Sequence, residues 1–144
     1  MTAQDRYRAM LRDDIAPALR LRGFIGSGAT YVLPDDTHWL QLGFQASRWN
    51  SSPEVKFTVN MAIAEKAAWA RLAAERGYAS RPNPNTTYSP DIAARRLGTM
   101  AFGADRWWRV GDGATPTSGV VDSVLEAVDR VAIPLLRSRQ LPTR

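Results

Sequence analysis

Two carboxylates and a lysine could together form a metal-dependent hydrolytic site. Asp35 follows a proline, and Glu54 and Lys56 stand together further along the chain. In metal-dependent nucleases, carboxylates bind the metal and a lysine steadies the attacking water. The hydrophobic pattern, however, places Asp35 before one strand of a hairpin and Glu54 at the start of the next, about 30 Å apart. A nuclease or hydrolase is therefore the least favoured of three hypotheses, and a requirement for a divalent metal would distinguish it.

His38 is the only imidazole in the chain, and cysteine is absent. A lone histidine could act as a general base, but no nucleophile stands near it in a recognised motif. A surface or capping role for His38 is favoured. Thiolate and multi-histidine zinc sites are excluded by composition. We therefore predict no catalytic residue, no metal and no cofactor.

Two adjacent segments alternate between apolar and polar residues. Residues 38–47 and 55–63 are predicted to be half-buried strands, and the short link 48–53 makes them an antiparallel hairpin. The face opposite the core carries amide, hydroxyl and charged side chains: Gln41, Gln45, Ser47, Lys56, Thr58 and Asn60. These groups could hydrogen-bond a ligand, with Trp39, Arg48 and Trp49 adding flat or charged contact surface. The alternative is a polar sheet face turned to water.

Arg106, Trp107, Trp108 and Arg109 alternate charge with aromatic surface. This composition suits an interface hot spot or base stacking combined with phosphate contacts. In a strand the two indoles face opposite ways, so one belongs to the core and the other to a rim. Arg106 and Trp108 are taken as candidate binding residues.

The remaining patterns predict the elements that position these residues. Helical spacing covers residues 4–22, with a kink near Pro17, then 64–76 and a last helix whose apolar stripe runs over 121–135 and which Pro134 bends or ends. Residues 24–33 are predicted to form a short strand pair or one bent strand, and 94–100 and 106–110 are predicted to be strand-like or irregular. The loop 78–90 is functional or mobile, and 136–144 is a frayed tail. The fold class is α+β: a twisted antiparallel sheet of about four to six strands, packed against N-terminal, middle and C-terminal helices.

Composition limits the class of protein. A chain of 144 residues, with 44% hydrophobic and 23% charged residues, is expected to form one domain over 1–144. The net charge of +5 makes an acidic partner plausible, although scattered surface charge also serves solubility. No apolar run approaches the ~20 residues needed to cross a bilayer, and the N-terminal residues lack a signal-peptide pattern. We therefore expect a cytoplasmic protein without a membrane partner.

The order of several short motifs resembles a known family. The motifs are Gly23 and Phe24, then Gln45 to Asn50, Phe57 to Asn60, Arg96 to Gly98, and Asp105 with Trp107 and Trp108. Together they are similar to the bacterial family called domain of unknown function 4304, over about residues 10–112. The resemblance implies an intracellular α+β domain and supplies no catalytic residues.

Three functions therefore remain open. The first is a non-catalytic binding module that recognises a protein partner, by analogy an immunity-type protein that blocks an acidic target. The second is a nucleic-acid-binding protein, which steep salt dependence would distinguish. The third is the metal-dependent nuclease or hydrolase.

Overall fold

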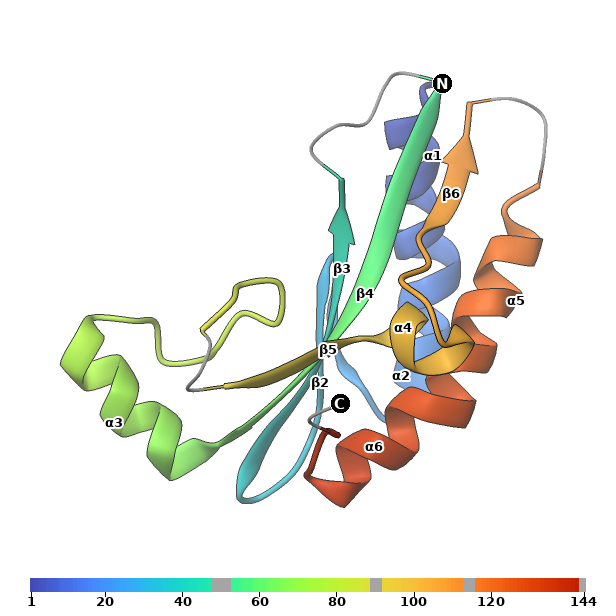
Figure 1. The fold of residues 1–144 in the computed structure, drawn as a ribbon. Helices are drawn as coiled ribbons and strands as arrows, with labels where there is room; N and C mark the ends of the chain where they lie inside the picture. The colour runs from blue at the N-terminus through green and yellow to red at the C-terminus, as the bar shows by residue number, and fades with distance from the viewer. Residues whose placement is uncertain (48–52, 89–91, 113–115, 143–144) are drawn as a thin grey trace.

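A six-stranded antiparallel sheet forms the centre of the molecule, with helices on both faces (Figure 1). The computed structural model describes residues 1–47, 53–88, 92–112 and 116–142. The strands are β1 (Ile25–Ser27), β2 (Thr30–Leu33), β3 (His38–Ala46), β4 (Glu54–Glu65), β5 (Ala93–Arg96) and β6 (Trp108–Gly111). Neighbouring strands follow the order β1-β2-β3-β4-β5, and β6 also pairs with β4. The predicted α+β class and antiparallel sheet are confirmed.

The hairpin of β3 and β4 has the predicted alternation. Leu42 lies opposite Met61, and Phe44 lies opposite Val59. All four side chains are buried in the main core, because directly opposed residues of an antiparallel pair face the same side of the sheet. The hairpin therefore has one apolar face and one polar face.

Strands β5 and β6 pair with successive parts of the same edge of β4, and helix α4 (Leu97–Phe102) lies between them. The prediction of strand-like structure through residue 100 is wrong, because the chain leaves β5 after Arg96 and turns into this helix. A side chain at Gly98 would collide with the backbone carbonyl of Arg106, so glycine permits the close return of the chain. Leu97 is fully buried and anchors the turn to the core.

The N-terminal helix runs through a π-helical turn in front of its proline. Its parts are α1 (Ala3–Met10), η1 (Leu11–Ile15) and α2 (Ala16–Leu21). Pro17 has no N–H to donate and crowds the preceding turn. The π-helical turn η1 is therefore the irregularity that was predicted as a kink near Pro17. The helix ends at Gly23, whose φ is 95°, and the N–H of Phe24 donates to the carbonyl of Leu19 at 3.0 Å.

The C-terminal helix repeats this arrangement on the same face of the sheet (Figure 1). Its parts are α5 (Ser118–Ala127), η2 (Val128–Ala132) and α6 (Ile133–Ser138), with Pro134 beginning the last part. In the segment 136–144, predicted to be a frayed tail, Leu136 and Leu141 are buried and Arg139 pairs with Asp35 at 2.6 Å, whereas residues 137–140 are exposed. Apolar side chains beyond the proline supply the burial that holds this segment.

Helix α3 (Lys66–Arg76) lies on the opposite side of the sheet (Figure 1). Residues 77–88, which we call the covering loop, follow it. The Trp69 ring stacks on Tyr78 at 5.6 Å between centroids and meets Tyr88 edge-on at 4.9 Å. The indole N–H of Trp69 donates to the carbonyl of Ala79 at 3.2 Å. These contacts make a second, smaller core that fixes the loop against α3.

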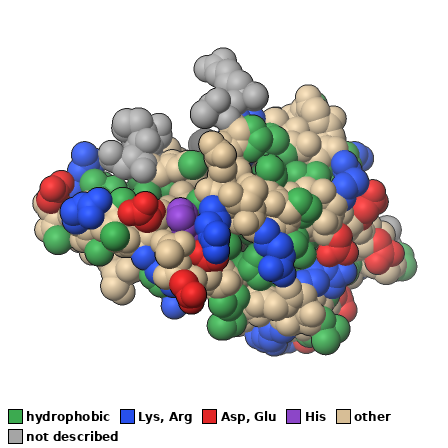
Figure 2. Space-filling model, turned by 90° about the horizontal axis from the view of Figure 1, so that it is seen from below, with side chains coloured by type: hydrophobic (Ala, Val, Ile, Leu, Met, Phe, Trp, Pro, Cys, Tyr) green, Lys and Arg blue, Asp and Glu red, His purple; other side chains and the backbone are tan. Residues whose placement is uncertain are grey.

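Charged side chains of both signs cover the end of the molecule where α6 and the β2–β3 turn lie. Figure 2 shows this face, on which Lys and Arg are interspersed with Asp and Glu rather than gathered in one patch. Among the described residues, no helix is both long and apolar enough to span a membrane.

Candidate binding site on the polar face of the sheet

The covering loop crosses one half of the polar face. The side-chain amide of Gln41 donates to the carbonyl of Pro82 at 2.8 Å, and that of Asn85 donates to the carbonyl of Phe44 at 3.1 Å. A side chain at Gly43 would collide with Asn85, so glycine lets the loop lie flat on the strand. Gln41, predicted to be a binding residue, is only 1% exposed and instead holds the loop. The alternation of polar and apolar residues placed Gln41 on the polar face of the sheet, but it did not show that the covering loop buries that part of the face.

Asn60 lies at the border between the covered and the open half. Its amide donates to the side-chain carbonyl of Gln45 and to that of Asn85, both at 2.9 Å. Asparagine has a low propensity for strand interiors, and these two hydrogen bonds explain its presence here. Asn60 therefore joins the loop to the exposed amide of Gln45.

The open half carries a cluster that we call the polar-face site. Its members come from β3, β4, β5 and the segment leading into β6: Gln45, Ser47, Lys56, Asn60, Arg96, Asp105, Trp107 and Arg109. Two hollows lie along it. One, of about 770 Å³, is lined by Ser47, Lys56, residues 105–109 and, from α5, Gly119, Val120 and Ser123, and the other, of about 350 Å³, is lined by Gln45, Asn60 and Arg96 together with residues of the covering loop. Both volumes lie in the range of ligand-binding clefts.

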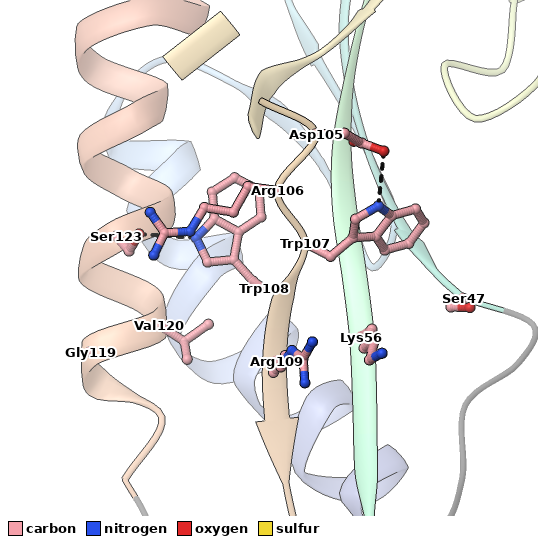
Figure 3. A pocket seen from close by; sticks show the side chains of 10 residues that line it. All are labelled: Ser47, Lys56, Asp105, Arg106, Trp107, Trp108, Arg109, Gly119, Val120 and Ser123. Carbon is pink, nitrogen blue, oxygen red and sulfur yellow. Dashed lines mark hydrogen bonds between the residues drawn. The ribbon is translucent and has the colours of Figure 1, made fainter. Parts of the chain in front are cut away.

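Trp107 is held in place by two neighbours. Asp105 accepts a hydrogen bond from Arg96 at 2.6 Å and lies 3.4 Å from the indole nitrogen of Trp107 (Figure 3). The Arg96 guanidinium also lies 5.0 Å from the centre of the Trp107 ring, within cation–π range. The indole is half-buried, so part of it remains available for contact.

Trp108 points the opposite way, toward α5 (Figure 3). It stacks on Phe57 at 5.9 Å between centroids, and its indole N–H donates to the hydroxyl of Ser123 at 3.0 Å. With 6% exposure, Trp108 is the core indole of the pair, although it also lines the larger hollow, and its role in binding stays a prediction. Trp107, its neighbour, is the indole at the site. The alternation of side chains along a strand required one core and one rim tryptophan, but it did not show which of the two was which.

Arg106 lines the larger hollow from the side of α5, and its guanidinium lies 4.5 Å from the centre of the Phe102 ring. Arg109 is opposite Lys56 in the β4–β6 register and forms an ion pair with Glu54 at 3.4 Å. Arg96 pairs with Asp105, so both acidic groups near the site face an arginine. Positive charge exceeds negative charge here, which favours an anionic or polar ligand.

Thr58 lies between Lys56 and Asn60 on β4, on the same face. The register that pairs Phe57 with Trp108 places Thr58 beside Trp107. The Thr58 side chain is fully buried, and its hydroxyl has no hydrogen-bond partner among the described residues. A buried polar group without a partner is unusual. The Thr58 hydroxyl makes the sheet surface next to the Trp107 indole polar.

The residues of the metal hypothesis lie at opposite ends of the sheet. Asp35 accepts hydrogen bonds from Arg139 at 2.6 Å and from the backbone N–H of His38 at 2.9 Å. The Arg139 guanidinium, with the backbone donors, holds the pKa of Asp35 well below its usual range. Glu54 pairs with Gly111 at the other end of β4. In the described parts of the chain, no three His, Cys, Asp or Glu side chains lie close enough to hold a metal.

Trp39 and His38 lie near Asp35, away from the polar-face site. The side-chain nitrogen of Lys66 and the guanidinium of Arg81 lie 4.9 and 5.2 Å from the centre of the Trp39 ring. His38 Nδ1 lies 2.8 Å from the Thr37 hydroxyl, consistent with a local capping contact. The structure thus separates Trp39 from Gln45, Ser47 and Asn60. Arg48 and Trp49 lie outside the described residues.

Fold and site define an α+β protein in which a loop covers half of a polar sheet face and an arginine–tryptophan cluster occupies the rest. The chain belongs to the family described as Domain of unknown function (DUF4304), whose model matches residues 15–138. This confirms the resemblance. No curated protein and no solved structure matched the chain. The segments that carry the resemblance, including 57–60, 96–98 and 105–108, meet at the polar-face site.

Proposed function

We propose that this protein is a non-catalytic binding module that recognises a protein partner through the polar-face site. The observation that carries the proposal is Trp107, an indole left half-exposed and fixed between Arg96 and Asp105 beside a cleft. Tryptophan and arginine are the side chains most enriched among interface hot spots. A contact residue held in place before binding loses less conformational entropy on association.

The charge of the site limits the kind of surface that a partner can present to it. Lys56, Arg96 and Arg109 stand around it against two acidic groups, Glu54 and Asp105. Electrostatic complementarity favours an acidic surface or segment. The exposed amide of Gln45 adds a donor and an acceptor for the partner's backbone or polar side chains. The partner is therefore a protein with an acidic, polar contact surface.

Affinity capture with matched variants tests this proposal. The tagged protein is incubated with lysate of its own cells after nuclease treatment, and stoichiometric partners are quantified by mass spectrometry. Trp107→Ala is expected to weaken capture by about 30-fold, the loss typical of a hot-spot tryptophan. Trp39→Ala, which removes a half-buried indole at the other end of the sheet, is the control and should capture normally. Equal capture by wild type and Trp107→Ala would exclude the polar-face site.

Nucleic-acid binding is the second candidate, and the excess of arginine and lysine at the site favours it. Phosphate contacts release counterions, so the logarithm of the binding constant would fall steeply and linearly with the logarithm of the salt concentration. Fluorescence anisotropy with a labelled single-stranded oligonucleotide between low and physiological salt measures this slope. Tight binding with a steep slope, lost in Trp107→Ala, would put this candidate ahead of the protein partner.

A further inference from the structure

A different cavity lies on the helical side of the sheet, outside the polar-face site. Its volume is about 560 Å³, and apolar side chains form most of its wall, among them Tyr7, Leu11, Ala16 and Phe44. The pairing of the strands explains its position. Strand β2 begins at Thr30, opposite Gly43, whereas β3 continues to Ala46, so β3 extends beyond β2 there and the N-terminal helix overhangs this corner.

Arginines form the polar rim of this cavity. Arg8, Arg12 and Arg20 follow one side of the helix at multiples of four residues, in line with Ala16. Arg12 is paired with Asp13 at 2.8 Å and Arg8 with Asp5 at 3.6 Å. Arg20 instead donates to the backbone carbonyl of Gly26 at 3.1 Å, and it forms no ion pair with the described residues. Arg20 is therefore the cation best placed to meet an anionic group.

Tyr31 lies behind the cavity wall, in contact with Phe44, and does not itself line the cavity. Its side chain is 0% exposed, and its hydroxyl has no hydrogen-bond partner in the described part of the chain. Its ring meets Phe44, which lines the cavity, edge-on at 5.8 Å between centroids. Burial raises the pKa of Tyr31, and the charge of Arg20 opposes this effect; Tyr31 in turn helps to raise the pKa of Tyr7. The geometry connects Tyr31 to the cavity wall through the ring of Phe44.

We propose that this cavity binds a medium-chain monocarboxylate, with its apolar chain against Leu11 and Phe44 and its carboxylate on Arg20. An apolar cavity with few polar groups is the usual form of a small-molecule site, and the volume lies in that range. The distance along the helix from Arg12 to Arg20 is about 12 Å, which suits an extended chain of medium length. Arginine binds carboxylates in a two-pronged geometry. This inference does not depend on the proposed partner binding at the polar-face site.

Decanoate is the probe for this proposal, titrated below its aggregation concentration into the full chain. Calorimetry should show one site, and NMR should show shifts of the Ala16 and Ala46 methyl groups. Decanol, which lacks the carboxylate, and Arg20→Gln should each bind about tenfold more weakly or worse. Arg71→Gln is the control, because Arg71 is exposed on α3 and does not line this cavity, and it should bind as the wild type does.

Blocking the cavity gives a second test that spares the core. Ala46 lines the cavity yet is exposed, so Ala46→Phe should abolish decanoate binding while the melting temperature stays near that of the wild type. Binding that is unchanged in Arg20→Gln or Ala46→Phe would overturn the proposal, as would equal binding of decanol. Absence of shifts at residues 16 and 46, or a concentration-dependent dimer that occupies this face, would overturn it equally. The polar-face experiments would be unaffected by any of these results.

Discussion

The contact between Gly43 and Asn85 gives the sharpest prediction about the structure. Gly43→Ala places a methyl group against the side chains of Asn85 and Pro84. Overpacking of this kind costs about 1–3 kcal/mol of unfolding free energy. Asn85→Ala removes the bonds to the carbonyl of Phe44 and from the amide of Asn60, worth together about 1–3 kcal/mol.

The double variant separates these effects. Asn85→Ala removes the closest collision of the new methyl group and leaves only the contact with Pro84, so Gly43→Ala should cost at least about 1 kcal/mol less in that background. Urea unfolding, followed by tryptophan fluorescence and far-ultraviolet circular dichroism, measures all four proteins. Thr86→Ala, an exposed neighbour on the same loop, is the control and should unfold as the wild type does within about 0.5 kcal/mol. Additive costs would refute the docking of the covering loop on β3.

Two further predictions concern the adjacent tryptophans and the ion pair of Asp35. Trp108→Ala should lower the unfolding free energy by about 3–5 kcal/mol, because it empties core volume, whereas Trp107→Ala should cost less than about 2 kcal/mol; equal costs in urea unfolding would contradict the assignment of core and rim. The folded-state pKa of Asp35 is depressed, so its pairing with Arg139 stabilises the protein above the unfolded pKa of about 4, and this stability is lost as the pH falls below it. Asp35→Asn should therefore show a smaller drop in urea midpoint between pH 6 and pH 3 than the wild type, and an identical drop would count against the ion pair.

Regular patterns made much of the fold predictable. The alternation in residues 38–47 and 55–63 was enough for the hairpin, because a strand with one buried face must repeat every two residues. Pro17 and Pro134 predicted the two helix irregularities, since proline cannot donate in the helical ladder. The last helix was likewise evident from its apolar stripe.

The site was less predictable, because its residues depend on contacts between distant segments. Gln41 has the spacing of a water-facing residue, yet the covering loop buries it. Gly43 was the available signal, since glycine inside a strand often marks close approach of another backbone. Nothing local distinguished Trp107 from Trp108, whose directions depend on the pairing of β6 with β4. The helical turn at Leu97 depends on the close return of the chain past Gly98.

The most direct test of the central claim is site-specific photocrosslinking in the protein's own cells. A photoreactive amino acid is placed at position 109, in the polar-face site, or at position 71, on the exposed side of α3. We predict a discrete protein adduct from position 109, lost in the Trp107→Ala background, and none from position 71. An adduct from position 71 with none from position 109 would contradict the assignment of the polar-face site as the partner-binding surface.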